Sequence, residues 1–303
     1  MKMFRYQLEP YKGMKTRFCC PKCGKKNVFT KYVDTESNAY LNELVGCCNR
    51  MLKCGYHYKP REYFQDNNIS SAISFKSKGI GDKKSKLKTS FIAIDIMQKS
   101  MSGKNYFIDY LASLWDMETA NFLKEKYNIG TSKYWSGATV FWQLDKERRV
   151  RSGKIMLYNP KSGKREKKPF NHINWVHSVL KLKDFNLDQC YFGEHLLVED
   201  KNKPVAIVES EKTAVISSIY LPEFIWLACG SVNNLNASKT KCLKGRSVIL
   251  FPDLKCYDIW NDKIPTFTNL ATFRTSTLLR DYATEKEKDM GLDLADYLIK
   301  IKP

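Results

Sequence analysis

Three short apolar runs mark the last hundred residues of the chain. They occupy residues 205–208, 224–228 and 247–251, and segments of helix length separate them. A strand that is apolar at every position is buried on both faces, which is typical of parallel sheets. Parallel neighbours need a long crossover, so this spacing predicts βαβ units and a small parallel α/β sheet.

The middle of the chain carries two other patterns. Residues 91–127 repeat apolar positions at helical spacing, with breaks near Gly103 and at Asp116, and predict short amphipathic helices. A strand, a turn and a second strand follow at 139–145, 146–149 and 150–158, and another turn at 160–164. The middle region is therefore expected to be a mixed α+β structure.

Six of the ten cysteines lie before residue 55. Cys20, Cys23, Cys48 and Cys54 give C-x2-C, an insert of 24 residues, then C-x5-C. Four thiolates at such spacing can close a tetrahedron around zinc, and a glycine after Cys23 and after Cys54 permits the tight turns this requires. The sequence predicts a structural zinc site, because disulfides are rare in chains that lack an export signal.

The choice of ligands stays open on spacing alone. Cys19 and Cys47 adjoin the favoured ligands, and His57 could replace Cys54. Residues 27–34 alternate apolar and polar side chains, and 39–41 follow after a polar turn, so the insert is expected to form hairpins. Four isolated cysteines are expected to be buried free thiols: Cys190, Cys229, Cys242 and Cys256.

These patterns divide the chain into parts. Residues 67–90 are polar and basic and are expected to be a flexible linker. We expect an α+β / α/β multidomain protein with a zinc ribbon at 1–66, a basic linker at 67–90, a basic α+β subdomain at 91–200 and a parallel-sheet α/β domain at 201–303.

Charge indicates a polyanionic partner. The chain has 51 Lys and Arg against 32 Asp and Glu, a net +19, and residues 1–200 hold 36 of the basic and 20 of the acidic residues. Such a surface suits nucleic acid or an anionic membrane, and no clear basic amphipathic helix favours the membrane. No apolar run approaches the roughly 20 residues of a membrane span, and no signal peptide is evident. We expect a cytoplasmic protein.

Basic side chains crowd the expected middle sheet. Those predicted to contact nucleic acid are Arg149, Arg151, Lys154, Lys164 and Arg165, together with Lys212 of the next domain. Trp142, Tyr158 and Trp175 are interleaved with them and could stack bases. The alternative is that the lysines are merely solvated and the aromatic residues belong to the core.

Two carboxylates follow the apolar runs. Glu209 comes directly after the first run and Asp253 shortly after the third, so both are expected at the carboxyl edge of the sheet, where ligands bind. Converging carboxylates suit Mg²⁺, a hard ion that takes oxygen ligands. Asp293 could be a further ligand or a helix N-cap, and Glu211 is expected to be a surface charge. Strand-end carboxylates also serve as caps or ion pairs, which is the alternative.

The same segments resemble the successive motifs of Toprim domains in DnaG-type primases. These are Val-Ala-Ile-Val-Glu-Ser-Glu-Lys ending at Lys212, Leu-Ala-Cys-Gly-Ser ending at Ser231, and Leu-Phe-Pro-Asp ending at Asp253. Residues 191–194 are similar to the aromatic-Gly motif that precedes Toprim in primases, and 293–298 to the acidic C-terminal motif. The whole layout resembles zinc-ribbon Toprim proteins of Bacteroidetes mobile elements, of the DUF6371-like kind.

The resemblance implies roles for individual residues. It implies that Glu209 acts as general acid/base or metal ligand in nucleotidyl transfer and that Asp253 binds Mg²⁺ or Mn²⁺. Lys255 stands where the second acid of the D-x-D pair belongs, and Asp258 lies five residues after Asp253. Lys154 or Lys212 would neutralise phosphate.

Two functions follow as expectations. The first is a primase-like enzyme of mobile-element replication that acts on single-stranded DNA and nucleoside triphosphates, with a helicase or mobilisation protein as a further expected partner. The second is a non-catalytic DNA-binding protein with a degenerate Toprim metal site. A zinc-dependent enzyme is disfavoured, because four thiolates leave no open position on the metal.

Overall fold

A computed structural model describes residues 5–50, 53–67, 88–267 and 270–301. The chain forms two compact units, residues 1–84 and 85–303. Most of the expected linker at 67–90 lies outside the described residues. No helix in the described ranges is long and apolar enough to cross a lipid bilayer.

The smaller unit is an antiparallel ribbon. Its strands are β1 (Tyr6–Leu8), β2 (Phe29–Asp34), β3 (Gly46–Cys48) and β4 (His57–Tyr58), paired in chain order. The strand expected at 27–34 is β2, whereas residues 39–41 form only an isolated bridge between Tyr40 and Val33. A short 3-10 turn, η1 (Met14–Thr16), and the helix α1 (Pro60–Asp66) complete the unit, and α1 begins with Pro60, whose fixed φ suits the first helical position.

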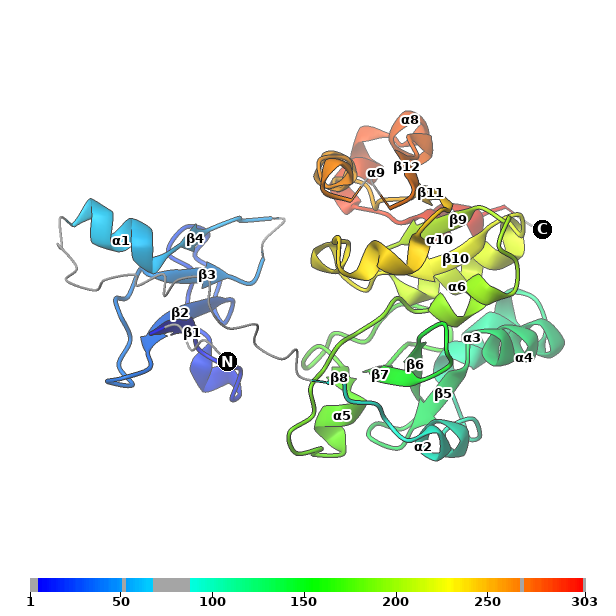
Figure 1. Cartoon of the computed structure of the whole chain (residues 1–303), viewed down its shortest axis with the longest axis horizontal. Coiled ribbons are helices and arrows are strands. Elements are labelled where there is room, and N and C mark those ends of the chain that lie inside the picture. The colour runs from blue at the N-terminus through cyan, green and yellow to red at the C-terminus, as the bar shows by residue number, and fades with distance from the viewer. Residues whose placement is uncertain (1–4, 51–52, 68–87, 268–269, 302–303) are drawn as a thin grey trace. The chain divides into compact units, whose positions relative to one another are not determined.

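The larger unit begins with three helices and an antiparallel sheet (Figure 1). The helices are α2 (Ile94–Lys99), α3 (Tyr106–Leu114) and α4 (Met117–Lys126). The predicted break at Asp116 is confirmed, because its carboxylate accepts a hydrogen bond from the Thr119 N–H at 2.6 Å and caps α4. The strands β5 (Ile129–Ser132), β6 (Ala138–Leu144), β7 (Val150–Met156) and β8 (Ile173–Trp175) pair in chain order, and α5 (Val176–Val179) follows.

The β5–β8 sheet is covered on both faces. Phe141 of β6 packs into the large core, and its neighbour Trp142 packs into a second cluster on the other face. Every residue of β6 is buried. The expectation that Trp142 and Tyr158 stack bases is therefore wrong, since both are core residues.

The predicted parallel sheet is present. Its strands are β9 (Val205–Val208), β10 (Ile225–Ala228), β11 (Ser247–Leu250) and β12 (Thr272–Thr275), all parallel, in the order β10-β9-β11-β12. The sequence pattern did not reveal β12, an edge strand whose residues are exposed or only partly buried. The helices of this part are α6 (Glu211–Tyr220), α7 (Tyr257–Asn261), α8 (Leu278–Tyr282), α9 (Glu285–Met290) and α10 (Leu294–Leu298), and its short 3-10 turns are η2 (Glu194–Val198), η3 (Val232–Asn234), η4 (Lys239–Leu243) and η5 (Ile264–Thr266).

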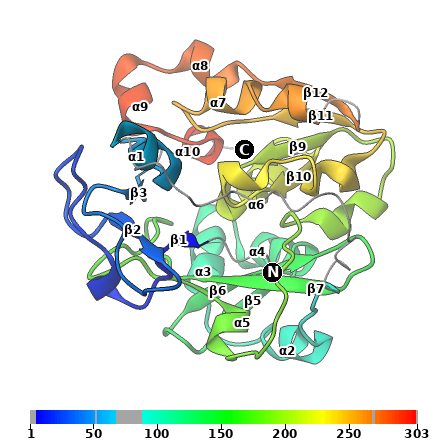
Figure 2. The ribbon, with the colours of Figure 1, turned by 60° about the vertical axis from the view of Figure 1, so that its left-hand side comes forward.

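One core joins the two sheets of the larger unit. The ring of Phe192, just before η2, packs on Tyr127 at 5.3 Å and on Phe141 at 5.4 Å between centroids. Its backbone also bridges to Ala228 of β10. Figures 1 and 2 both place α6 on the side of the parallel sheet that faces β5–β8. Residue 200, expected as a domain boundary, marks no break in this core.

Candidate functional site

Four cysteines of the ribbon converge. The sulfur atoms of Cys20, Cys23, Cys48 and Cys54 all lie within 4.8 Å of one another. The Cys20 and Cys54 sulfurs are 3.7 Å apart. Zn–S bonds of about 2.3 Å in a tetrahedron require sulfurs about 3.8 Å apart, and a disulfide requires about 2 Å. The arrangement therefore fits a four-coordinate structural zinc.

The backbone of the knuckle supports thiolate at this site. A backbone hydrogen bond from Lys25 is the main cause that lowers the pKa of Cys23 to about 6. The Gly24 N–H donates to the Cys20 carbonyl at 2.9 Å, which closes the turn, and Gly24 adopts a φ of 63° that suits glycine. One guanidinium nitrogen of Arg50 lies 3.6 Å from the Cys23 sulfur.

The alternative ligands lie outside this cluster. Cys19 is exposed and its sulfur contacts the Gly24 carbonyl at 3.3 Å. His57 stacks on Tyr32, and its Nε2 lies 2.9 Å from the tyrosine hydroxyl. Cys47 pairs across the sheet with His57 and is not among the converging sulfurs.

Glu209 and Asp253 lie at the switch point of the parallel sheet. From β9 the chain passes to β10 on one side and then to β11 on the other, so β9 and β11 are neighbours whose connections leave in opposite directions. Glu209 directly follows β9, and Asp253 follows β11. Ligands of open parallel sheets bind in the crevice that this reversal creates at the carboxyl ends.

Burial and neighbouring charges shift the pKa of both carboxylates. Burial is the main cause that raises the pKa of Asp253 well above its usual range, and the charges of Asp293 and Glu209 raise it further. Burial also raises the pKa of Glu209, while the nearby Lys154 ammonium lowers it. The charge of Glu211 also raises the pKa of Glu209. Buried carboxylates that repel one another favour binding of a proton or a cation.

Asp293 takes part in a fixed network beside them. Its Oδ1 accepts a hydrogen bond from the Asp296 N–H at 3.0 Å and caps α10, and its Oδ2 accepts one from the Thr213 hydroxyl at 2.7 Å. Lys212 lies 3.8 Å from the Asp296 carboxylate. Asp293 is thus an N-cap, one of the two roles expected of it. The pattern analysis missed Thr213, which links α6 to α10.

Glu211 is buried, contrary to expectation. Only 2% of it is exposed, and its carboxylate accepts hydrogen bonds from the Lys154 ammonium at 3.0 and 3.1 Å. A Cβ on Gly230, whose φ is 70°, would come within 3.3 Å of the Glu211 Oε1. The pair thus joins β7 to the first turn of α6 beside the candidate site. Lys154 is 9% exposed and is not a solvated contact for phosphate.

Two other residues turn away from the carboxylates. The Lys255 ammonium donates to the Asp289 carbonyl at 2.9 Å and lies 3.4 Å from the Asp289 carboxylate. Asp258 lies in α7, is exposed, and is 4.0 Å from Arg280. The cation at position 255 therefore pairs with α9, and Asp258 does not replace the missing acid.

In the described residues, potential metal ligands lie close enough together to bind one ion only in the ribbon. Over the described ranges, the four cysteines form the only group of three or more potential ligands whose ligand atoms all lie within 4.8 Å of one another. Glu209, Asp253 and Asp293 do not form such a group in the described part of the chain.

The expected nucleic-acid contacts divide into paired and unpaired cations. Arg149 forms ion pairs with Asp145 at 2.9 Å and Glu147 at 2.8 Å, and Arg151 pairs with Asp188 at 3.2 Å. Lys154 pairs with Glu211 and Lys212 with Asp296, whereas the last two predicted contacts, Lys164 and Arg165, form no ion pair within the described part of the chain. The positive charge of Arg165 lowers the pKa of Glu209, although burial dominates and raises it.

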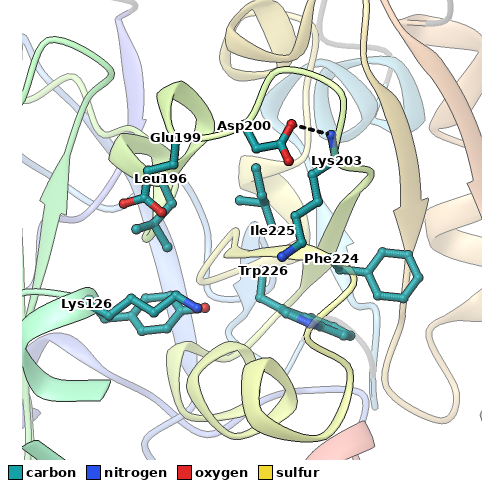
Figure 3. A pocket seen from close by; sticks show the side chains of 9 residues that line it. Lys126, Leu196, Glu199, Asp200, Lys203, Phe224, Ile225 and Trp226 are labelled. Atoms are coloured by element: carbon teal, nitrogen blue, oxygen red, sulfur yellow. Dashed lines mark hydrogen bonds between the residues drawn. The ribbon is translucent and has the colours of Figure 1, made fainter. Parts of the chain in front are cut away.

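A small cavity lies at the opposite edge of the sheet. It holds about 100 Å³ and lies beside the start of β10, between Lys126 and Lys203 (Figure 3). Trp226 forms part of its wall. Lys203 precedes β9 and Ile225, which also lines the cavity, begins β10, so the cavity is at the amino edge of the sheet. It is separate from the crevice that holds Glu209 and Asp253.

Comparisons with known families give two matches. A model described as a zinc beta-ribbon finger matches residues 4–69, and one described as a domain of unknown function, DUF6371, matches residues 105–254. The first match, together with the four converging sulfurs, confirms the predicted zinc ribbon. The second spans Glu209 and Asp253, and its description names no activity. A comparison with curated proteins gave no match.

Several solved primase structures match this chain with low TM-scores and low sequence identity. The primase fragment of the bacteriophage T7 primase-helicase is 12% identical, with a TM-score of 0.37 over 91% of this chain and 98% of that one. The RNA polymerase domain of Mycobacterium tuberculosis DnaG is 10% identical, with a TM-score of 0.41 over 68% and 79%. The E. coli primase catalytic core is 12% identical, with a TM-score of 0.39 over 68% and 80%. At such similarity the likeness says nothing about activity.

Proposed function

We propose that this chain is a nucleic-acid-binding, primase-like Toprim protein that carries out metal-dependent nucleotidyl transfer in mobile-element replication. The placement of Glu209 and Asp253 at the switch point of a parallel sheet carries the proposal. Under this proposal, residues 91–200 form the part that resembles a primase core, and residues 201–303 form the Toprim-like part.

The donor set suits Mg²⁺ or Mn²⁺. Both are hard cations that take carboxylate oxygens, and Glu209 and Asp253 supply such oxygens from neighbouring strand ends. Burial is the main cause that raises the pKa of both acids, and neighbouring carboxylates raise it further, Glu211 at Glu209 and both Asp293 and Glu209 at Asp253. A divalent cation would relieve this repulsion. Asp293 would support the site from α10, since its oxygens already accept two hydrogen bonds. When bound, the cation would stabilise charge on phosphate oxygens.

The residues of the chain would act on a growing strand and a nucleoside triphosphate. The strand's 3′ oxygen would attack the α-phosphorus, the bond to the β-phosphate oxygen would break, and pyrophosphate would leave. Glu209 would accept the proton of the attacking hydroxyl, which its raised pKa favours at neutral pH. Lys212 and Arg165 would neutralise phosphate, whereas Lys154 is committed to Glu211.

The partners in this proposal are single-stranded DNA and nucleoside triphosphates, with a helicase or mobilisation protein working alongside, in the cytoplasm. The net charge of +19 supports a polyanionic partner. A structural zinc ribbon would hold a rigid basic surface for the template.

The test is oligonucleotide synthesis on single-stranded templates with Mg²⁺ or Mn²⁺. We expect the wild-type chain to extend and Glu209→Gln or Asp253→Asn to lose at least about 100-fold in rate, the scale of one lost charge-stabilising group. Asp258→Asn is the control and should leave the rate unchanged, because its side chain faces Arg280. Equal synthesis by Glu209→Gln would overturn the catalytic proposal.

A second candidate is a non-catalytic DNA-binding protein with a degenerate metal site. Lys255 in place of the second acid favours it, and so does the absence of a metal-sized acidic cluster in the described ranges. In that case Mn²⁺ would not raise the melting temperature, no oligonucleotide would form, and single-strand binding would still weaken steeply with salt. A metal-induced rise that Asp253→Asn abolishes would exclude this candidate.

A further inference from the structure

An exposed aromatic and basic surface lies at one end of the β5–β8 sheet. The loop 133–137 joins β5 to β6, and the loop 157–172 joins β7 to β8. In an antiparallel sheet whose strands pair in chain order, these two loops lie at the same end, and the turn 145–149 lies at the other. The two loops carry Tyr134, Trp135, Phe170 and His172 together with Lys133, Lys167 and Lys168, which we call the loop-end surface.

The aromatic rings of the loop-end surface touch one another. Phe170 stacks on His172 at 4.5 Å between centroids, and Trp135 meets His172 edge-on at 5.1 Å. Tyr134 packs edge-on against Trp135 at 4.6 Å. Phe170 is 54% exposed and Tyr134 is 49% exposed, while His172 is buried beneath them. The rings of Phe170 and Tyr134 are thus exposed to solvent and packed against the partly buried rings beneath them.

The first loop is held in place before any ligand arrives. The Tyr134 N–H donates to the Ser132 hydroxyl at 3.1 Å, and the Ala138 N–H donates to the Trp135 carbonyl at 3.0 Å. Gly137 has a φ of 74°, and a Cβ there would come within 2.6 Å of the Tyr106 ring. Binding of a ligand to the exposed rings therefore does not carry the entropic cost of ordering the loop, and this favours high affinity.

The lysines of this surface are uncompensated. Lys133, Lys167 and Lys168 are exposed, and among the ion pairs of the described residues none involves them. At the opposite end of the sheet, Asp145 and Asp188 pair with Arg149 and Arg151. The unpaired lysines of the loop-end surface lie next to the exposed Tyr134 and Phe170 in the sequence, although the exposed Lys146 and Arg148 of the turn 145–149 also form no ion pair among the described residues.

We propose that the loop-end surface binds single-stranded nucleic acid, with unstacked bases on Phe170 and Tyr134 and phosphates on Lys133, Lys167 and Lys168. Stacking needs bases released from a duplex, and an open ring flanked by cations is the combination that single-strand readers use. A protein partner would gain less, because the three ammonium groups would need carboxylates to match them.

One loop links the surface to the candidate site along the chain. The 157–172 loop that carries Phe170 also carries Arg165, whose charge reaches Glu209. A strand lying on the open rings would therefore be close to the loop that borders the carboxylates. The idea that the bound strand leads to the carboxylates rests on the proposed function, whereas the binding of the strand to the loop-end surface does not.

The first experiment measures affinity by fluorescence anisotropy with the full chain and a labelled single-stranded 20-mer, as DNA and as RNA. We expect Phe170→Ala and Tyr134→Ala each to raise Kd about tenfold, the scale of one lost base stack. Phe170→Trp should keep wild-type affinity, and Phe170→Leu should lose it, since leucine is apolar but has no π face. Phe122→Ala is the matched control, an exposed ring on α4 with a lysine 5.6 Å from its centroid, and should not change Kd.

The second experiment measures the salt dependence of the same binding. Each phosphate contact contributes about 0.7 to the slope for a single strand, so Lys133→Gln with Lys168→Gln should reduce it by about 1.4. Arg149→Gln should leave the slope unchanged, because its guanidinium already pairs with Asp145 and Glu147. A loss from Arg149→Gln with none from the lysine pair would overturn the proposal.

The outcomes separate this proposal from the catalytic one. Wild-type affinity in Phe170→Ala and Tyr134→Ala would refute the loop-end surface even if Glu209→Gln abolished synthesis. Conversely, tenfold weaker binding by these variants would sustain it even if the chain made no oligonucleotide. Equal affinity for duplex and single strand, or affinity only for an acidic protein, would also count against it.

Discussion

His195 shows how one buried residue sets the response to acid. It is 1% exposed, its Nε2 lies 3.0 Å from the Lys126 carbonyl, and burial lowers its pKa to about 4. Between pH 6.5 and 4, His195 is protonated in the unfolded chain but stays neutral in the folded one. As the pH is lowered through this range, the free energy of unfolding therefore decreases by up to about 3 kcal/mol. Above pH 6.5 this contribution is fully present.

The prediction is tested by urea unfolding at pH 7, 6, 5 and 4. All six tryptophans lie beyond residue 84, so their fluorescence follows the larger unit alone. His195→Asn should flatten the decline between pH 6.5 and 4, whatever its stability at pH 7. An unchanged slope in this variant would show that His195 is not the group responsible.

At the scale of elements, the Lys154 and Glu211 pair fastens β7 to α6. Both side chains are buried and the ammonium lies 3.0 and 3.1 Å from the carboxylate oxygens. Lys154→Ala leaves a buried charge without a partner and should cost about 3–5 kcal/mol, whereas Lys154→Met combined with Glu211→Leu should remain near wild-type stability.

The exposed Lys99 and Asp95 pair of α2 is the control for that comparison. Its atoms are 3.1 Å apart, but both side chains are solvated, so Lys99→Ala should cost less than about 1 kcal/mol in the same tryptophan-monitored unfolding. Equal losses from Lys154→Ala and Lys99→Ala would contradict a structural role for the buried pair.

At the scale of the whole molecule, the two units differ in what holds them together. The described part of the ribbon has four fully buried apolar side chains, and two of them, Cys20 and Cys48, belong to the candidate zinc site. So small a core needs a metal to stay folded. Chelation should therefore release one zinc per chain and make residues 5–66 sensitive to protease, while tryptophan fluorescence from the larger unit stays unchanged.

Single cysteine variants give the matched comparison. Cys20→Ser should abolish zinc retention, and Cys19→Ser should retain it, because the Cys19 sulfur faces the Gly24 carbonyl outside the cluster. Zinc content measured by atomic absorption and the protease pattern should change together. Loss of zinc from Cys19→Ser would mean that the ligand set differs from the four sulfurs described.

Local signals explain what the sequence predicted well. Asp116 ends one helix and caps the next because its side chain binds a backbone N–H three residues away, and the apolar run at β9 needs no distant partner to be recognised as a strand. The zinc ligands were found because cysteine spacing reflects the size of a metal site.

Distant packing explains what the sequence predicted wrongly. Nothing near Trp142 in the sequence states that both faces of its sheet would be covered. Glu211 looked like a surface charge because its partner, Lys154, lies 57 residues away in another sheet. Edge strand β12 escaped notice because its exposed residues lack an apolar run.

The sequence by itself determined the apolar strands β9, β10 and β11, the cap at Asp116, the cysteine ligands and the excess of positive charge, since each depends on neighbours within a few residues or on composition. Only the tertiary structure decided which cations remain free, which aromatic rings face solvent, and that Glu211 is buried against Lys154. Those properties depend on burial and on partners brought together from distant segments, because charge pairing and desolvation act through space and not along the chain.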